Sequence, residues 1–451
     1  MNIIIVGCGR VGQTLAAQLN EEGNNITVVD VSAESVNDLV SRHDIMGVVG
    51  NGATHTVLQE AGIGSADLMI AVTGSDELNL LCCLIAKKEG NCQTIAKVKN
   101  PVFSAEAPYL KDELGLAMVI NPEHAAASEI ARVLRFPSAI KIETFAKGRV
   151  ELLKFRIPEG SRIIGMSVKE VMIKLGCDIL FCTAERGSEA HIVHGDFVFE
   201  SKDVISIIAS PKSASEFFAK IGYKSHSVKK AMIVGAGDTT HYLCDILQKS
   251  GISLKIVEKD EDICSDIADK WDDVAVIHGD ANDKEILLEE GLEDMGAFVA
   301  LTGLDEENIL LSLYAKSVGD VKIITRINRV DYDDVIKHLD LDTTVYPKAI
   351  TADMIVRYVR AMKNTMGSNV ETLYNVIKGK VEASEFIVRE NSPITGVPLA
   401  ELKFKDNVLI AAILRGKKVI IPRGYDVICP GDNVVIVSGT MALHDICDVL
   451  R

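Results

Sequence analysis

The chain has 451 residues, of which 47% are hydrophobic and 5% aromatic, and its formal net charge at pH 7 is −16. This length predicts several globular domains, at about 100–200 residues per domain. The net acidity and the scarcity of aromatic rings disfavour a nucleic-acid-binding role, which needs a basic face and surfaces on which bases can stack.

The chain opens on a short apolar run, residues 2–6, which carries no basic n-region and stops too soon for a signal peptide. We expect it to be the first strand. Further β-branched runs alternate with segments of helical period, which predicts six βα units in a doubly wound parallel sheet of the Rossmann-like α/β type. No apolar stretch approaches the ~18 residues that a membrane-spanning helix needs. The expected strands are 2–6, 26–30, 46–49, 67–72, 93–98 and 117–120.

A glycine-rich loop joins the first expected strand to the first expected helix. Residues 7–12 read GCGRVG, a GxGxxG pattern. Gly7 allows a tight turn, Gly9 lets the backbone approach a pyrophosphate, and Gly12 lets the helix pack closely with its N-terminus facing the anion. Asp30 ends the second strand, where a carboxylate accepts hydrogen bonds from the adenosine ribose and repels a 2′-phosphate, which favours NAD over NADP. Without a ligand, the same glycines would serve only a sharp strand-to-helix turn.

Polar residues follow other strands at the same carboxyl edge of the sheet, where ligands of such folds bind. Asn51 follows the third strand, and Thr73 and Gly74 follow the fourth. Lys97 ends the fifth strand, where its ammonium could reach the phosphates or simply be solvated.

The next segment has a different pattern of apolar residues. Residues 139–222 show a strand, a short helix and a hairpin that includes Val204–Ile208, which predicts a small α+β module. We expect such modules to dimerise, since no ligand cluster for an ion is visible in them. The polar stretch 222–230 is the expected linker between the two halves of the chain.

The second half of the sequence then repeats the first, with offsets of 225 to 229 residues that indicate small loop insertions in a duplicated unit. We therefore predict an A-B-A-B order, in which each Rossmann-like sheet is followed by a small α+β domain. The expected domains are 1–138, 139–222, 228–366 and 367–451. The matching pairs are Val6–Gly9 with Val234–Gly237, Asp30 with Glu258, Ala71–Asn79 with Ala300–Asn308, Asn121-Pro122 with Tyr346-Pro347, and Gly195–Asp203 with Gly424–Asp432.

The second glycine loop is less regular than the first. Gly235 and Gly237 remain, but Thr240 replaces the third glycine and Asp238 stands where the first copy has an arginine. An acid beside a phosphate-binding loop is unfavourable unless a cation compensates, and Arg326 is the candidate. The second copy is thus either a second nucleotide site or a degenerate structural copy, and we slightly favour the copy. The other polar positions that it keeps are Glu258, Asp280 and Thr302.

No catalytic constellation accompanies the glycine loops. A dehydrogenase needs a proton donor or acceptor at the nicotinamide. The one formal match, Tyr374-x-x-x-Lys378, lies in the strand-like start of the last module, where the spacing favours a surface ladder. His191 and His194 are too few ligands for a metal and are interpreted as solvated loop residues. A Rossmann-like unit without a catalytic acid or base is better explained as a ligand sensor than as an enzyme.

The ten cysteines include no CxxC pair, so the sequence indicates neither a disulfide framework nor a zinc site, and free thiols favour the cytosol. Cys8 lies inside the glycine loop at a helix N-terminus, where a lowered pKa would make it oxidisable. A small packed residue is the alternative that we favour.

The duplicated order, the loop at 7–12, the segments Val28–Asp30 and Ala71–Asn79, and the tail Pro430–Val435 together resemble the TrkA family, the peripheral subunits of bacterial and archaeal Trk potassium-uptake systems. The resemblance covers essentially the whole chain. It implies tandem domains that regulate potassium conductance (RCK domains), each with a nucleotide-binding part and a small C-terminal part. It also implies a cytoplasmic protein that binds NAD(H), with ATP or ADP as further candidates, at the inner face of the cell membrane. There it would form a homo-oligomeric ring, a tetramer by analogy, that gates a membrane-embedded potassium transporter.

An NAD-dependent oxidoreductase and a stand-alone nucleotide or redox sensor are the alternative functions. The resemblance places the first nucleotide site by position, with Lys97 where the family has an arginine, a change that would weaken phosphate binding. The altered loop at Asp238 and Thr240 weakens the case for a second site. The site residues are Gly7, Cys8, Gly9, Arg10, Val11, Gly12, Asp30, Asn51, Thr73, Gly74 and Lys97 in the first copy, and Gly235, Gly237, Glu258, Asp280, Thr302 and Arg326 in the second.

Overall fold

The computed structural model describes the chain from Met1 to Arg451 except for residues 91, 137–138, 146–148, 188, 223–227, 249, 330–332, 340, 366–369, 378–379, 391, 440–442 and 444. The centre of the expected linker, 223–227, therefore lies outside the described residues. The chain forms two compact units. Unit 1 combines Met1–Ala131 with Val228–Val356, and unit 2 combines Arg132–Ser227 with Arg357–Arg451. Each unit thus takes one segment from each half of the chain.

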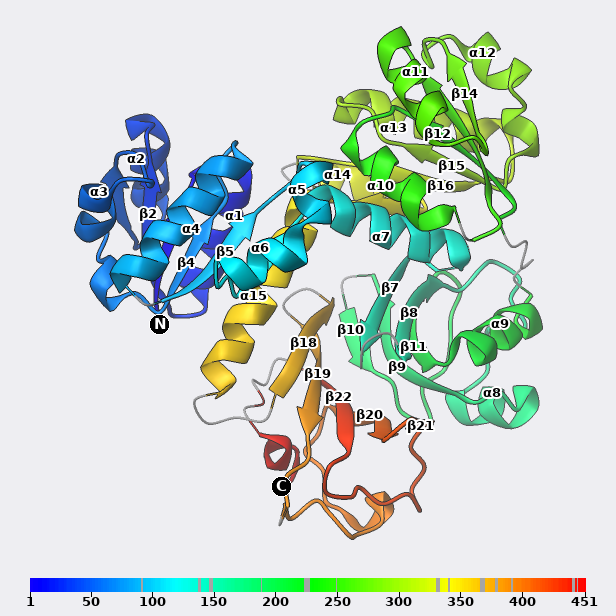
Figure 1. Cartoon of the computed structure of the whole chain (residues 1–451). Coiled ribbons are helices and arrows are strands. Elements are labelled where there is room, and N and C mark those ends of the chain that lie inside the picture. The colour runs from blue at the N-terminus through cyan, green and yellow to red at the C-terminus, as the bar shows by residue number, and fades with distance from the viewer. Residues whose placement is uncertain are drawn as a thin grey trace. The chain divides into compact units, whose positions relative to one another are not determined.

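The first repeat of unit 1 is a six-stranded sheet in the order β3-β2-β1-β4-β5-β6, drawn in blue and cyan in Figure 1. All its strand pairs are parallel, which confirms the predicted doubly wound α/β fold. The strand order reverses between β1 and β4, and crevices at such switch points are where ligands bind. The strands are β1 (Asn2–Val6), β2 (Asn25–Asp30), β3 (Met46–Val49), β4 (Leu68–Ala71), β5 (Gln93–Lys97) and β6 (Met118–Ile120). The helices are α1 (Arg10–Glu21), α2 (Ala33–Arg42), α3 (His55–Glu60), η1 (Ile63–Ser65), α4 (Asp76–Gly90), α5 (Pro101–Ala105), α6 (Ala107–Glu113) and α7 (Pro122–Arg135).

The second repeat of unit 1 has the same topology, in the order β14-β13-β12-β15-β16-β17, and is drawn in colours from green to yellow in Figure 1. The duplication seen in the sequence is therefore a duplication of the whole parallel sheet. The strands are β12 (Lys230–Val234), β13 (Ser253–Glu258), β14 (Val274–His278), β15 (Ala297–Ala300), β16 (Lys322–Arg326) and β17 (Thr343–Val345). The helices are α10 (Asp238–Leu247), α11 (Glu261–Lys270), α12 (Lys284–Glu289), η2 (Leu292–Asp294), α13 (Asp305–Val318), α14 (Asp333–Ile336), η3 (Lys337–Leu339) and α15 (Pro347–Thr365).

The sequence explains why these segments form strands and helices. All four residues of β4 are buried, as are the last four of β1, and such continuous apolar runs suit strands that are covered on both faces. Helix α2 begins behind Ser32, whose hydroxyl accepts a hydrogen bond from the Ser35 amide at 3.2 Å. Asp260 caps α11 in the same way in the second repeat.

Unit 2 contains two antiparallel five-stranded sheets. Their orders are β10-β9-β11-β8-β7 and β18-β19-β22-β20-β21. The first sheet comprises β7 (Lys141–Phe145), β8 (Val150–Arg156), β9 (Ile179–Arg186), β10 (Glu189–Ile192) and β11 (Val204–Ala209), with helices α8 (Val168–Leu175) and α9 (Pro211–Lys220). The second comprises β18 (Val370–Ile377), β19 (Val381–Ile387), β20 (Val408–Arg415), β21 (Lys418–Ile420) and β22 (Asn433–Gly439), with the short helices η4 (Leu399–Glu401) and η5 (Ile446–Val449).

The predicted hairpin at Val204–Ile208 is wrong in its pairing. The segment does form a strand, β11, but this strand lies in the middle of its sheet between β8 and β9. The hairpin is instead formed by β9 and β10. A nearly continuous apolar run is what a central strand requires, because both of its edges and most of its side chains are buried.

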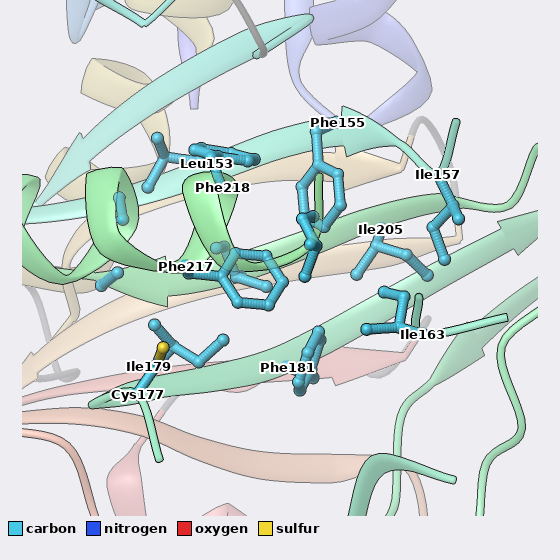
Figure 2. Close-up of a cluster of buried hydrophobic side chains, with 14 of the residues drawn as sticks. Leu153, Phe155, Ile157, Ile163, Cys177, Ile179, Phe181, Ile205, Phe217 and Phe218 are labelled. Atoms are coloured by element: carbon cyan, nitrogen blue, oxygen red, sulfur yellow. The ribbon is translucent and has the colours of Figure 1, made fainter. Parts of the chain in front are cut away.

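A phenylalanine cluster forms the core of the first small module (Figure 2). The rings of Phe155 and Phe218 meet edge to face at 5.1 Å, and Phe217 lies 5.7 Å from both Phe155 and Phe181. Each buried ring contributes about 1.5–3 kcal/mol of hydrophobic stabilisation, so this core holds α9 against the sheet.

The two small modules also share a core within unit 2. Buried residues of the first module, such as Leu152 and Ile208, belong to the same cluster as Ala412 and Val435 of the second. The two small modules of one chain therefore pack against each other.

Among the residues that the structure describes, no helix has the length and apolarity to cross a bilayer. The same residues include no group of three or more His, Cys, Asp and Glu side chains that could hold a metal ion.

Candidate functional site

A cavity of about 510 Å³ opens at the carboxyl edge of the first sheet. Its volume is in the range of small-molecule sites, roughly 300–1,000 Å³. The loops that follow β1, β2, β3 and β4 line it, so the structure brings together residues that lie far apart in the sequence. The sequence-predicted residues that line the cavity are Gly7, Gly9, Arg10, Val11, Asp30, Asn51, Thr73, Gly74 and Lys97.

Each of the three glycines of the first loop has a different structural role. Gly7 has φ +108°, and a Cβ on it would lie 2.9 Å from the Thr73 amide nitrogen. A Cβ on Gly12 would lie 1.8 Å from the Gly7 carbonyl oxygen, so α1 packs directly on the loop. At Gly9 a Cβ would meet no atom of the chain within 4 Å. This glycine therefore leaves open space above the N-terminus of α1, where an anion is favoured.

The Asp30 carboxylate organises the loop and also borders the cavity. One of its oxygens accepts a hydrogen bond from the Cys8 amide at 2.6 Å, and the other accepts from the Ser32 amide at 2.9 Å. An ionised carboxylate accepts about four hydrogen bonds, so lone pairs remain for a ligand hydroxyl. Val31 beside it is 74% exposed and lines the cavity with an apolar side chain.

Asn79, on α4, ties two strand ends of the site together, a role that the sequence prediction missed. Its Oδ1 accepts hydrogen bonds from the amide and the hydroxyl of Thr73, both at 2.8 Å. Its Nδ2 donates to the Lys97 carbonyl oxygen at 2.9 Å. Asn308 makes the corresponding bonds to Thr302 and Arg326 in the second repeat. The sequence match between Ala71–Asn79 and Ala300–Asn308 pointed to this segment. A sequence match alone does not show which side-chain contacts the two segments share.

We expect Asn79→Ala to lower the stability of the first repeat by about 1–3 kcal/mol, because it leaves buried backbone groups without partners. It should also weaken ligand binding, since Thr73 loses its fixed position. Asn308→Ala is the matched control: thermal unfolding should show a similar loss of stability, and titration calorimetry should show unchanged ligand affinity. Equal affinity losses in the two variants would contradict this assignment.

Lys97 lines the cavity and is half-buried. Its ammonium donates a hydrogen bond to the Val72 carbonyl oxygen at 3.3 Å. Burial lowers the pKa of Lys97, against the opposing effect of Glu123 and Asp76. Lys97 thus borders the same cavity as the glycine loop.

Two predicted residues of the first loop, Cys8 and Gly12, do not line the cavity. Burial, together with the charge of Asp30, raises the pKa of the Cys8 thiol to about 12. The structure therefore does not provide a lowered thiol pKa, and Cys8 serves the loop through its backbone amide. Gly12 has no side chain to contact the Gly7 carbonyl oxygen, which allows α1 to approach Gly7.

The other residues considered for chemistry lie in unit 2, outside this cavity. His191 is on β10, with Nε2 3.3 Å from a Glu189 carboxylate oxygen, and His194 is exposed. Tyr374 is on β18, and Lys378 lies outside the described residues.

The second repeat keeps the backbone arrangement of the site. Gly235 has φ +92°, and the Glu258 carboxylate accepts a hydrogen bond from the Ala236 amide at 2.8 Å, as Asp30 does from Cys8. Thr240 replaces the third glycine and donates its hydroxyl to the Gly235 carbonyl oxygen at 2.6 Å. Asp280 shapes the loop after β14 by accepting from the Asn282 amide at 2.9 Å.

Charged side chains distinguish the two repeats at this edge. Where the first repeat has Arg10, Asp30, Asn51 and Leu78, the second has Asp238, Glu258, Asp280 and Glu307. Glu307 accepts a hydrogen bond from Asn282 at 2.6 Å, which places this acid at the loop after β14. The Nε atom of Arg326 is buried and has no hydrogen-bond partner among the described residues.

Two family models match the chain in alternation. The TrkA-N domain model matches residues 3–122 and 231–347, together more than half of the chain, and the TrkA-C domain model matches 152–222 and 383–451. The chain belongs to the TrkA family. Its relatives in the TrkA family include "Trk system potassium uptake protein TrkA homolog 1" of Methanosarcina mazei, which is 33% identical over 99% of both chains. The "Trk system potassium uptake protein TrkA" of Haemophilus influenzae is 31% identical over 97% of this TrkA-family chain and 95% of its own.

Solved structures share the fold of this TrkA-family chain. "GsuK Channel" aligns with a TM-score of 0.65 at 17% identity, over 97% of this chain and 76% of its own. "GsuK channel bound to NAD" aligns with a TM-score of 0.64 at 17% identity, over the same shares of the two chains. "Crystal structure of the GsuK bound to ADP" aligns with a TM-score of 0.51 at 16% identity, over 79% of this chain and 69% of its own.

Proposed function

We propose that this chain is the regulatory subunit of a Trk-type potassium uptake system and that it responds to NAD(H) or another adenine nucleotide bound in the cavity of the first repeat. One observation carries the proposal: in a TrkA-family chain, the cavity at the switch point combines a glycine-lined helix N-terminus, a carboxylate and cations. Relatives across nearly the whole chain are named as potassium uptake proteins.

The residues of the first repeat fit a dinucleotide. The pyrophosphate would lie over Gly9 at the N-terminus of α1, where the chain leaves open space. The adenosine ribose would bond to Asp30, with the adenine against the exposed Val31. The other nucleoside would extend toward Thr73, beyond the switch point. A solved structure of the same fold is named as bound to NAD and another as bound to ADP, which supports an adenine nucleotide as the ligand class.

We propose one anion-binding site per chain, in the first repeat. Its cavity is lined by the cations Arg10, Lys97 and Lys348 and by the carboxylate of Asp30. The corresponding edge of the second repeat carries acids against the cation Arg326. Like charges repel the phosphates of a nucleotide at close range, so the second repeat serves as a structural copy.

The proposed role is binding without turnover. The residues that line the cavity include no histidine, tyrosine or cysteine, so the proton donors and acceptors most common in dehydrogenases are missing from that lining. Ligand binding regulates only if the nucleotide binds the conducting and non-conducting states with different affinity, because equal affinity shifts no equilibrium.

We further propose that the chain lies at the cytoplasmic face of the membrane as a homo-oligomeric ring around or beneath a membrane-embedded transporter. Each chain supplies a pair of RCK repeats whose small modules already share a core. A tetramer would thus provide a ring with twice as many repeats as chains.

Co-purification tests the assignment. A tagged full-length chain drawn from detergent-solubilised membranes of its source organism should carry a potassium transporter subunit, identified by mass spectrometry. NADH should bind stoichiometrically, with no loss of its 340 nm absorbance in the presence of small carbonyl substrates. Recovery of the chain without a transporter would favour the stand-alone sensor, and steady consumption of NADH would favour the oxidoreductase.

A further inference from the structure

Lys348 belongs to the second repeat but lines the cavity of the first. It is the second residue of α15 (Pro347–Thr365), the helix that follows β17. Yet it borders the same space as Arg10, Thr73 and Lys97. Because both repeats belong to unit 1, this placement is internal to one compact unit.

The two repeats carry opposite charges at two pairs of equivalent positions. Arg10 of the first repeat corresponds to Asp238 of the second, and Glu123 of the first corresponds to Lys348 of the second. Arg10 acts on Lys348, Asp238 acts on Tyr242 of α10, and Glu123 acts on both Lys348 and Tyr242. The two cations, Arg10 and Lys348, both line the cavity of the first repeat.

The electrostatics of Lys348 favour an anionic ligand. Burial lowers the pKa of its ammonium, and the charges of Arg10 and Arg326 lower it further, against Asp305 and Glu123. A half-buried ammonium that the charges of two guanidinium groups disfavour is stabilised by an anion that offsets the repulsion. The phosphates of a nucleotide would supply that anion, and a charge-assisted hydrogen bond to phosphate is among the strong ones.

We propose that Lys348 binds the phosphates of the nucleotide held in the first repeat, so that one ligand joins the two repeats. The inference rests on the proposed function, because it names a further binding residue of the same site. The ligand class that follows is a nucleotide, since a nucleoside offers Lys348 no phosphate to bind.

The repeats already touch near this point, which makes the coupling physically direct. The Tyr242 hydroxyl donates a hydrogen bond to the Lys99 carbonyl oxygen at 3.1 Å and accepts one from Asn121 Nδ2 at 2.9 Å. Its ring also meets His124 edge to face at 5.3 Å. Helix α10, which starts at the second glycine loop, is thus held against the loops after β5 and β6. A ligand that also engages Lys348 adds a second connection, and it favours whichever arrangement of the repeats allows both.

The test compares ADP with adenosine on the full-length chain by titration calorimetry. Lys348→Gln should bind ADP about tenfold or more weakly than the unaltered chain, with adenosine affinity unchanged, and Lys348→Arg should restore most of the ADP affinity. Glu123→Gln is the matched control at the equivalent position of the other repeat, and it should not weaken ADP binding. Hydrogen exchange supplies a second readout: ADP should protect the first turn of α15 in the unaltered chain but not in Lys348→Gln.

Two results would overturn the role of Lys348 alone: an unchanged ADP affinity in Lys348→Gln, or an equal loss for ADP and adenosine, which indicates a structural effect. An unaltered chain that binds no ADP, NADH or ATP would instead overturn the proposed function, and this inference with it. The two failures are distinguishable because only the second appears in the unaltered chain.

Discussion

Asp30→Ala is expected to abolish NAD(H) binding while the chain stays folded. The carboxylate orders the loop through the Cys8 amide and leaves lone pairs for two ribose hydroxyls. Hydrogen bonds to charged groups contribute about 1.5–3 kcal/mol each, so losing two of them should weaken binding at least a hundredfold or so. Titration calorimetry measures this loss, and circular dichroism checks the fold.

Glu258→Ala separates ligand loss from loop damage. Glu258 makes the same kind of bonds in the second repeat, to the amides of Ala236 and Lys259, both at 2.8 Å. Its removal should cost similar stability and leave NAD(H) affinity unchanged. An Asp30→Ala variant that binds as the unaltered chain does would refute the site, and a Glu258→Ala variant with the same loss would refute the single-site model.

Alanine substitutions at Gly9 and Gly12 should have opposite consequences. A Cβ on Gly12 would lie 1.8 Å from the Gly7 carbonyl oxygen, so Gly12→Ala must displace α1 and should destabilise the first repeat by about 1–3 kcal/mol. A Cβ on Gly9 meets nothing in the chain, and its φ of −68° suits alanine. Gly9→Ala should therefore keep the unfolding temperature and lose ligand affinity, because the methyl group occupies the space of the pyrophosphate.

Thermal unfolding and calorimetry on the two glycine variants provide the check. If Gly9→Ala bound NAD(H) as tightly as the unaltered chain, the ligand would not lie over this loop. If Gly12→Ala were as stable as the unaltered chain, the close packing of α1 on the Gly7 carbonyl would not require a glycine at this position.

The sequence predicts the parallel sheets well because their strands are short apolar runs buried on both faces, separated by clear helical segments. The carboxyl ends of parallel strands meet at one edge, so residues that end or follow strands, such as Asp30 and Thr73, can be gathered into a site before any coordinates are seen. The small modules are harder. The run at Val204–Ile208 identifies a strand, but its partners, β8 and β9, depend on pairing across the whole module.

Contacts that depend on how the repeats fold together could not be predicted. Lys348 follows a strand of the second repeat, and nothing in the pattern indicates that it lines the first repeat's cavity. Asn79 reads as an ordinary helix residue, because its role is to bond backbone groups of two strand ends. The two parallel sheets form one unit and the two antiparallel sheets form the other. This grouping is likewise a tertiary property that the A-B-A-B order does not reveal.

Potassium uptake tests the central claim, that nucleotide in the first repeat controls a transporter. Rubidium uptake would be measured in cells that depend on this chain for growth at low potassium, with each variant expressed at the same level. The account predicts that Glu258→Ala supports normal uptake, whereas Asp30→Ala co-purifies with the transporter yet no longer sets its rate. Normal, nucleotide-dependent uptake with Asp30→Ala would contradict the account.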